Sequence, residues 1–363
     1  LTKDLNTSFY KRYIEGEKMA AEPLTQTPAQ INAGAKDIEL DEKIRYLIEL
    51  KARTYEKVDY VKFAARDFLL RGENVPDSLN KIVKSAINTI NSAYDDALKH
   101  AQEIAEAYAK NDMKSVIMNA IEIYAAFNAI NEIAEELFTK YTFRYERHGF
   151  GNEIKKKLEQ IQGIVTYLLD KYVKYYLLTP AEQAKMLGDI IDNIEMFYDL
   201  FEPDSKEWDY MGNALDDLRA QLEDDENELT RSEYAMLSDT LDIIYNAYGN
   251  GITEGEVQRL RIRDFHLGDA SDICDAYDDP GRYGILCYDE GDNDDAYKAD
   301  SINYTELVKS ITEAYVDFRT MQIVYKILKD FKIESEEFEA NLDEILEKTR
   351  DIIETVLDYH IKS

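Results

Sequence analysis

The sequence lacks the residues and motifs that mark many enzymes and membrane proteins. Its 363 residues include two cysteines, four histidines, one tryptophan and six prolines. An apolar run of about 18 residues, the length that spans a bilayer, does not occur, so we expect no transmembrane segment. The phosphate-binding pattern G-x-x-x-x-G-K-[ST], the nucleophile pattern G-x-S-x-G and the zinc pattern H-E-x-x-H are also absent. The chain therefore carries no familiar catalytic signature.

Histidine is too sparse to suggest a metal centre. His100, His148, His266 and His360 are far apart in the sequence, so a zinc site would need ligands from distant segments. The Glu-x-x-His pattern of di-iron helical bundles does not occur. We interpret His148 and His360 as residues near helix C-termini, where a partly protonated ring suits the helix dipole.

Basic residues are outnumbered by acidic ones. The chain has 43 Lys and Arg against 74 Asp and Glu, which gives a formal net charge of −31. Such a charge repels nucleic-acid phosphates and anionic lipids, so we expect no nucleic-acid partner. It favours cations or basic partners. Tyrosine is abundant, with 27 Tyr against 13 Phe, and suits half-buried seams or a recognition surface.

Hydrophobic residues repeat with helical spacing through most of the chain. From Ser115 to about Arg147, apolar residues alternate spacings of four and three, which predicts one apolar face of a helix. The segment from Ile154 to Tyr175 repeats the pattern after a break at His148–Gly151. Together they predict an antiparallel pair of helices. The stripe of the first segment comprises Val116, Ala120, Ile123, Phe127, Ile130, Ala134, Leu137 and Tyr141.

Capping residues locate further helix starts. Ser335 with Glu336 and Glu337, and the capping boxes Thr179–Glu182 and Thr230–Glu233, each precede an apolar stripe. Gly249-Asn250-Gly251 predicts a helix end. Further helices are expected over Asp41 to Arg71, from Pro76 and Asp77 to about Tyr108, over Pro180 to Phe201, Ser205 to Glu223, Glu233 to Tyr248, Ser301 to Ile333, and from Ser335 onward.

These patterns predict an all-α fold of about nine helices, arranged as an elongated bundle or as two stacked bundles. An irregular acidic insertion near 252–300 interrupts it. Two stretches there have strand-like patterns, Leu260–His266 and Tyr283–Tyr288, and would pair as a short β-hairpin. The expected parts are a polar N-terminal segment with a short helix (1–40), a long-helix bundle (41–178), shorter helices (179–251), the acidic insertion (252–300) and a C-terminal helical hairpin (301–363).

The acidic insertion is the strongest local candidate for a site. Cys274 and Cys287 lie 13 positions apart and would close a disulfide loop worth roughly 3 kcal/mol in an oxidising compartment; the alternative is two free thiols. Its carboxylates suit a calcium site, although the EF-hand template fails because Asp294 and Asp300 replace the required Gly and Glu. A solvated loop and a docking surface for a basic partner are the alternatives. The candidate calcium ligands are Asp275, Asp278, Asp289, Asp292, Asp294 and Asp295.

Three functional classes follow. The first is a non-enzymatic structural or interaction protein, a bundle that assembles with itself or with partner chains at a cell surface or in a particle. The second is a secreted ligand-binding module with calcium in the acidic insertion. The third is an enzyme that uses carboxylate acid–base chemistry, which needs two carboxylates with pKa values pushed apart. The start at Leu1 rather than Met hints at an extracellular or processed protein, with a cytoplasmic location as the alternative.

Overall fold

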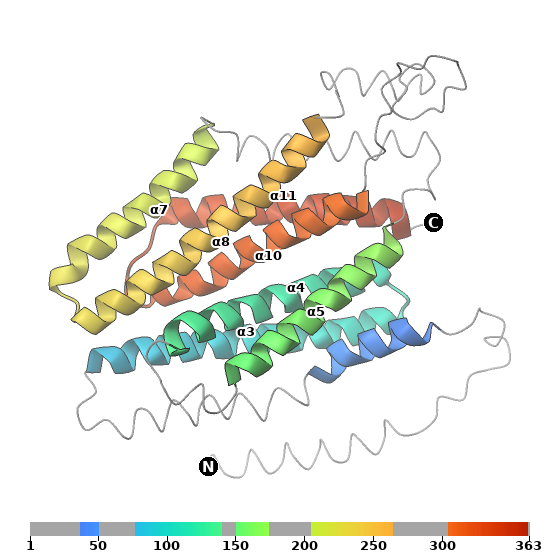
Figure 1. Ribbon diagram of the computed structural model, residues 1–363, viewed down its shortest axis with the longest axis horizontal. Helices are drawn as coiled ribbons and strands as arrows, with labels where there is room; N and C mark the ends of the chain where they lie inside the picture. The colour runs from blue at the N-terminus through green and yellow to red at the C-terminus, as the bar shows by residue number, and fades with distance from the viewer. Residues whose placement is uncertain (1–36, 51–76, 140–149, 174–204, 264–303, 362–363) are drawn as a thin grey trace, which may run out of the picture. The chain divides into compact units, whose positions relative to one another are not determined.

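The computed structural model describes residues 37–50, 77–139, 150–173, 205–263 and 304–361 (Figure 1). Of these residues 92% are helical and none is in a strand. The predicted all-α multi-helix bundle is confirmed, with eight α-helices in the described ranges where about nine were expected for the chain. The chain divides into two compact units, Leu1–Ile44 and Arg45–Ser363, and residues 38–50 are helical across that division.

The larger unit is built mainly from long helices that follow one another in the sequence. A π-helical segment, η2 (Ala134–Thr139), follows α4 directly, and a short 3-10 helix, η5 (Asp225–Asn227), follows α7. The α-helices are α3 (Asp77–Ala109), α4 (Met113–Ile133), α5 (Phe150–Tyr172), α7 (Lys206–Asp224), α8 (Arg231–Arg263), α10 (Tyr304–Lys329) and α11 (Glu336–Ile361).

Three predicted helix starts are confirmed by their capping hydrogen bonds. The Ser205 hydroxyl accepts the Trp208 N–H at 3.1 Å, and the Ser335 hydroxyl accepts the Phe338 N–H at 3.2 Å. The N–H of Glu233 donates to the Thr230 hydroxyl at 3.3 Å, while the Thr230 N–H donates to the Glu233 carboxylate at 2.9 Å. These bonds satisfy N–H groups that the first turn of a helix leaves without backbone partners.

The helices α4 and α10 are central. α4 packs against α3, α5, α10 and α11, whereas α10 packs most extensively against α8 and also against α3, α4, α5 and α11 (Figure 1). Every residue from 305 to 325 of α10 is buried or half-buried. On α4, Ile117, Ile121 and Ala125 are buried although they lie outside the predicted stripe. The prediction of a single apolar face for this helix is therefore incomplete.

Cross-helix hydrogen bonds set the direction of the central pair. The Tyr124 hydroxyl donates to Glu313 at 2.8 Å, and the Asn128 amide donates to the Thr320 hydroxyl at 3.0 Å. From the first contact to the second, the residue numbers rise along both α4 and α10, so the two helices run parallel. α11 returns antiparallel to α10, since Gln322 donates to Asp343 at 2.7 Å on the way to the connecting turn.

The predicted helix end at Gly249–Gly251 is wrong, because α8 continues to Arg263. A Cβ built on Gly251 would stand 2.6–3.0 Å from atoms of the Phe318 ring of α10. The glycine thus permits a close approach between α8 and α10, and this packing offsets the roughly 1 kcal/mol cost of glycine within a helix.

Two further boundary predictions change with the structure. Leu260–Arg263, predicted as part of a strand, is helical, while the remaining residues of the hairpin lie outside the described ranges. Phe150 and Gly151, predicted to break two helices apart, form the start of α5. The predicted helix over Pro180 to Phe201 lies outside the described residues.

Candidate functional site

A buried acid on α4 joins three helices through what we call the charge clamp, which comprises Glu122, Tyr315, Arg319 and Arg350. The Glu122 side chain lies within the most apolar part of α4, and only 8% of the residue's surface is exposed. The Tyr315 hydroxyl donates to its Oε1, and the Arg319 Nε donates to its Oε2 at 3.3 Å. Arg350 Nη1 of α11 lies 3.8 Å from Oε1. The buried negative charge therefore has two cationic neighbours.

A second layer of ion pairs continues the clamp toward the surface. Arg350 Nε donates to Glu354 at 2.8 Å, and Lys114 of α4 lies 3.0 Å from Glu354 and 3.1 Å from Asp358. Burial alone would raise the pKa of Glu354, but hydrogen bonds from Arg350 and Lys114 outweigh it and lower that pKa. The clamp therefore braces α4 against both α10 and α11.

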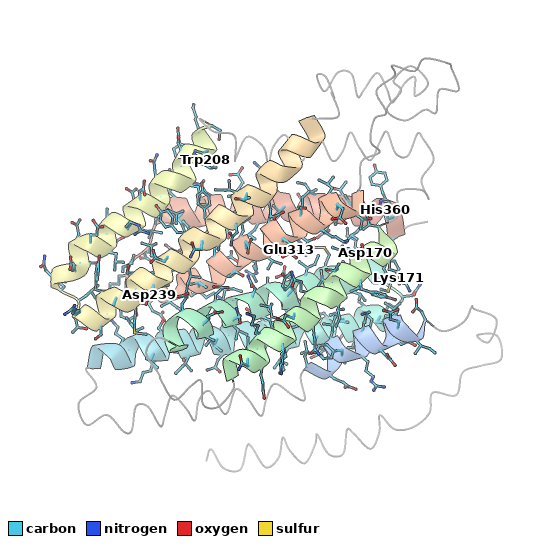
Figure 2. The ribbon with its side chains drawn as sticks, in the orientation of Figure 1. Asp170, Lys171, Trp208, Asp239, Glu313 and His360 are labelled. Atoms are coloured by element: carbon cyan, nitrogen blue, oxygen red, sulfur yellow. The ribbon has the colours of Figure 1, made fainter. Side chains whose placement is uncertain are left out.

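A second polar cluster lies where α8 packs against α10, near the end of α4. We call Glu132, Glu254, Glu313 and Asp317 the interior carboxylate cluster, and all four side chains are half-buried. Glu313, labelled in Figure 2 on α10, accepts the Tyr124 hydroxyl at 2.8 Å and the Gln162 amide of α5 at 3.2 Å. In contrast to the clamp, no lysine or arginine of the described residues pairs with these carboxylates.

The surroundings of the cluster favour protonated acids. Burial, followed by the negative charges of Glu313, Glu132 and Glu254, raises the pKa of Asp317 from 3.8 to about 7. Burial and the charges of Glu135 and Glu136 likewise raise the pKa of Glu132.

Both acids shift in the same direction. These two acids therefore do not form the divided pair, one protonated and one ionised, that carboxylate catalysis requires.

The third candidate is the outer face of α7, an exposed helix surface. We call the exposed residues Asp209, Tyr210, Asp217, Glu223 and Asp224 the α7 face. Tyr210 is 47% exposed, and within the larger unit it is the one exposed large hydrophobic side chain among the described residues.

No lysine or arginine of the described residues pairs with the four acids of the α7 face. Arg219 of the same helix instead pairs with Asp242 of α8 at 3.2 Å.

Trp208 lies at the start of α7 (Figure 2) and directly precedes Asp209 of this face in the sequence. It is half-buried, and its ring centroid is 6.2 Å from that of Tyr248 on α8. As the chain's single tryptophan, Trp208 gives the α7 face an intrinsic fluorescent reporter.

The site residues predicted from the sequence lie elsewhere. The six candidate calcium ligands, Asp275, Asp278, Asp289, Asp292, Asp294 and Asp295, and the proposed disulfide pair Cys274 and Cys287 fall within 264–303, outside the described residues. They stay predictions. Among the residues that are described, no three His, Cys, Asp or Glu side chains stand close enough together to hold a metal ion.

Sequence reasoning missed the charge clamp and the interior carboxylate cluster. A usable signal existed, because Glu122 stands between Ile121 and Ile123, and Asp317 stands between Val316 and Phe318. A charged residue inside an apolar run is costly to bury and so marks a paired or protonated group. Which partner each acid meets depends on the packing of distant helices.

The described chain is thus an all-α helical bundle with charged groups at the seams of its two central helices. None of its described helices contains a stretch of 18 residues apolar enough to cross a bilayer. Comparison of the chain with protein-family models, with curated proteins and with solved structures finds no match.

Proposed function

We propose that the protein is a non-enzymatic interaction protein whose helical bundle presents the α7 face to a basic partner chain. The observation that carries the proposal is an exposed aromatic side chain, Tyr210, which follows Asp209 on a helix that carries the three further exposed acids of the α7 face. None of these four acids has a cationic partner among the described residues. Exposed aromatics at the centre of a polar surface are typical anchors of protein interfaces.

The chemistry of the α7 face favours a partner of opposite charge over a second copy of the chain. Two like faces would bring their acids together, and the net charge of −31 adds long-range repulsion between copies. A basic segment with an apolar pocket or side chain for Tyr210 would relieve both costs. The charge clamp supports a rigid scaffold role, because its buried charges are engaged in joining helices.

The proposal can be tested with a defined probe, an amphipathic helical peptide rich in Lys and Leu, titrated into the full chain at about 0.15 M salt. Trp208 emission should change on binding, because that residue lies at the start of α7. The triple variant Tyr210→Ala, Asp217→Asn, Asp224→Asn should bind the peptide roughly tenfold or more weakly than the unmodified chain, as expected when an aromatic anchor is lost.

The matched control removes two exposed acids from another helix, with Glu347→Gln and Asp351→Asn on α11. This variant should bind the peptide as the unmodified chain does. Equal weakening by both sets of substitutions would show unspecific attraction to an acidic protein and would overturn the proposal. Peptide binding without any change in Trp208 emission would also count against it, as would a stable homodimer in sedimentation that protects Trp208 from quenching.

A further inference from the structure

The interior carboxylate cluster lies at the most extensive helix contact of the bundle. Glu313 and Asp317 are one turn apart on α10, Glu132 comes from the end of α4, and Glu254 comes from α8. Close by, the Phe318 ring lies against Gly251 of α8. The packing of α8 on α10 therefore holds several like charges together.

Three cations of α10 and α11 are engaged elsewhere. On α10, Lys309 binds Asp170 of α5 at 2.6 Å, and Arg319 binds Glu122 in the charge clamp. Arg350 of α11 is held by Glu354. α3 meets α10 near the end of that helix, where the Ser85 hydroxyl donates to Asp330.

The groups seen to face the cluster in the described part of the chain are acidic or neutral. Glu135 and Glu136 of η2 add negative charge beside Glu132. The neutral donors Tyr124 of α4 and Gln162 of α5 both donate to Glu313. Asp317 receives no hydrogen bond and no ion pair from the described residues. Among the described residues it therefore has no partner that would stabilise its charged form.

We propose that the interior carboxylate cluster is a proton-operated latch: a bound proton holds α8 against α10, and loss of that proton loosens α8. Three like-charged groups around an acid without a cation favour uptake of a proton. The raised pKa of Asp317, about 7, places the change in the neutral range. Since no metal-holding arrangement exists among the described residues, a proton is the simplest charge that relieves the repulsion.

The sign of the effect follows from the direction of the shift. Because the pKa of Asp317 is higher in the packed state than its ordinary 3.8, the packed state binds more protons between about pH 4 and 7. The latch is therefore most stable at the acidic end of this window. It weakens as pH rises, and the full cost of the ionised acid is present above about pH 7.

Hydrogen exchange on the full chain, corrected for the intrinsic rate at each pH, measures the latch directly. Protection of the α8 amides around 244–254 should fall by roughly tenfold between pH 6 and 8.5, the change expected for one group with a pKa of about 7. η2 also contacts α8 and should follow. Asp317→Asn, which mimics the protonated acid, should remove most of this pH dependence.

Asp351→Asn serves as the matched control, because it makes the same chemical change on the exposed face of α11. It should keep the full tenfold response. A wild-type chain with no response at α8, or an Asp317→Asn variant with an unchanged response, would refute the latch. If the Asp317→Asn variant does not fold, a ¹³C-carboxyl titration of the wild-type chain decides the question. A midpoint near pH 7 for Asp317 supports the latch, and a midpoint below about pH 5 refutes it.

Discussion

Glu122 and Asp317 lie on the two central helices, α4 and α10, yet their surroundings differ in charge. Glu122 is the more deeply buried and meets Arg319, Arg350 and the Tyr315 hydroxyl. Asp317 is half-buried and meets other carboxylates. Burial of an acid can be balanced either by a partner of opposite charge or by a proton. This bundle uses both at neighbouring seams, so the clamp and the cluster should respond oppositely to mutation and to pH.

The largest effect should come from removing the acid of the clamp. Glu122→Ala leaves the Tyr315 hydroxyl and Arg319 without their shared acceptor, and we expect the free energy of unfolding to fall by about 2–4 kcal/mol. Urea denaturation followed by circular dichroism measures the loss. Glu347→Ala, at an exposed position of α11, should change stability by less than about 0.5 kcal/mol. A loss for Glu122→Ala as small as that of the control would show that the clamp contributes nothing to stability.

A change in the contact between α8 and α10 should have a smaller effect and alter the cluster. Gly251→Ala forces a Cβ into the Phe318 ring, so we expect a loss of about 1–3 kcal/mol. By admitting water near Asp317, it should also reduce the pH dependence of α8 exchange. Gly249→Ala on the same helix meets nothing within 4 Å and should be neutral or stabilising by up to about 1 kcal/mol. Equal effects from the two glycines would contradict the packing described.

The smallest effect belongs to the outer layer of the clamp, where its pH response can be compared with that of the cluster. Glu354→Gln should cost less than about 1 kcal/mol at pH 7, since Glu354 and its partners are partly exposed. Because the pKa of Glu354 is lowered in the folded chain, its contribution is present above about pH 4.5 and is lost as pH falls. In thermal unfolding between pH 3 and 7, the melting temperature of the variant should fall less at acidic pH than that of the wild-type chain. If the variant loses as much stability at acidic pH as the wild-type chain does, Glu354 does not contribute to the clamp.

Several features could be predicted from local pattern. Ser205, Thr230 and Ser335 are capping residues followed by apolar stripes, and all three cap helices in the structure. The residues Ile154, Ile161 and Val165 of the predicted α5 stripe are buried. Such features depend on neighbours three or four positions away, which the sequence displays directly.

Other features depended on distant segments. Gly249 and Gly251 read as a helix end, yet Gly251 serves close packing between helices inside α8. The clamp and the cluster were also missed, because Glu122 and Asp317 look alike in the sequence, each an acid with an apolar residue on either side.

The amino-acid sequence by itself determined that the chain is acidic, that its described part is helical, and that none of the described helices could span a bilayer. Helical periodicity and capping are local properties, so they can be recognised without knowledge of the packing. Tertiary structure alone decided that Glu122 meets two guanidinium groups and Asp317 meets other carboxylates. The physical reason is that the charge state of a buried acid depends on its neighbours in space, and those neighbours are up to about 230 positions away in the sequence.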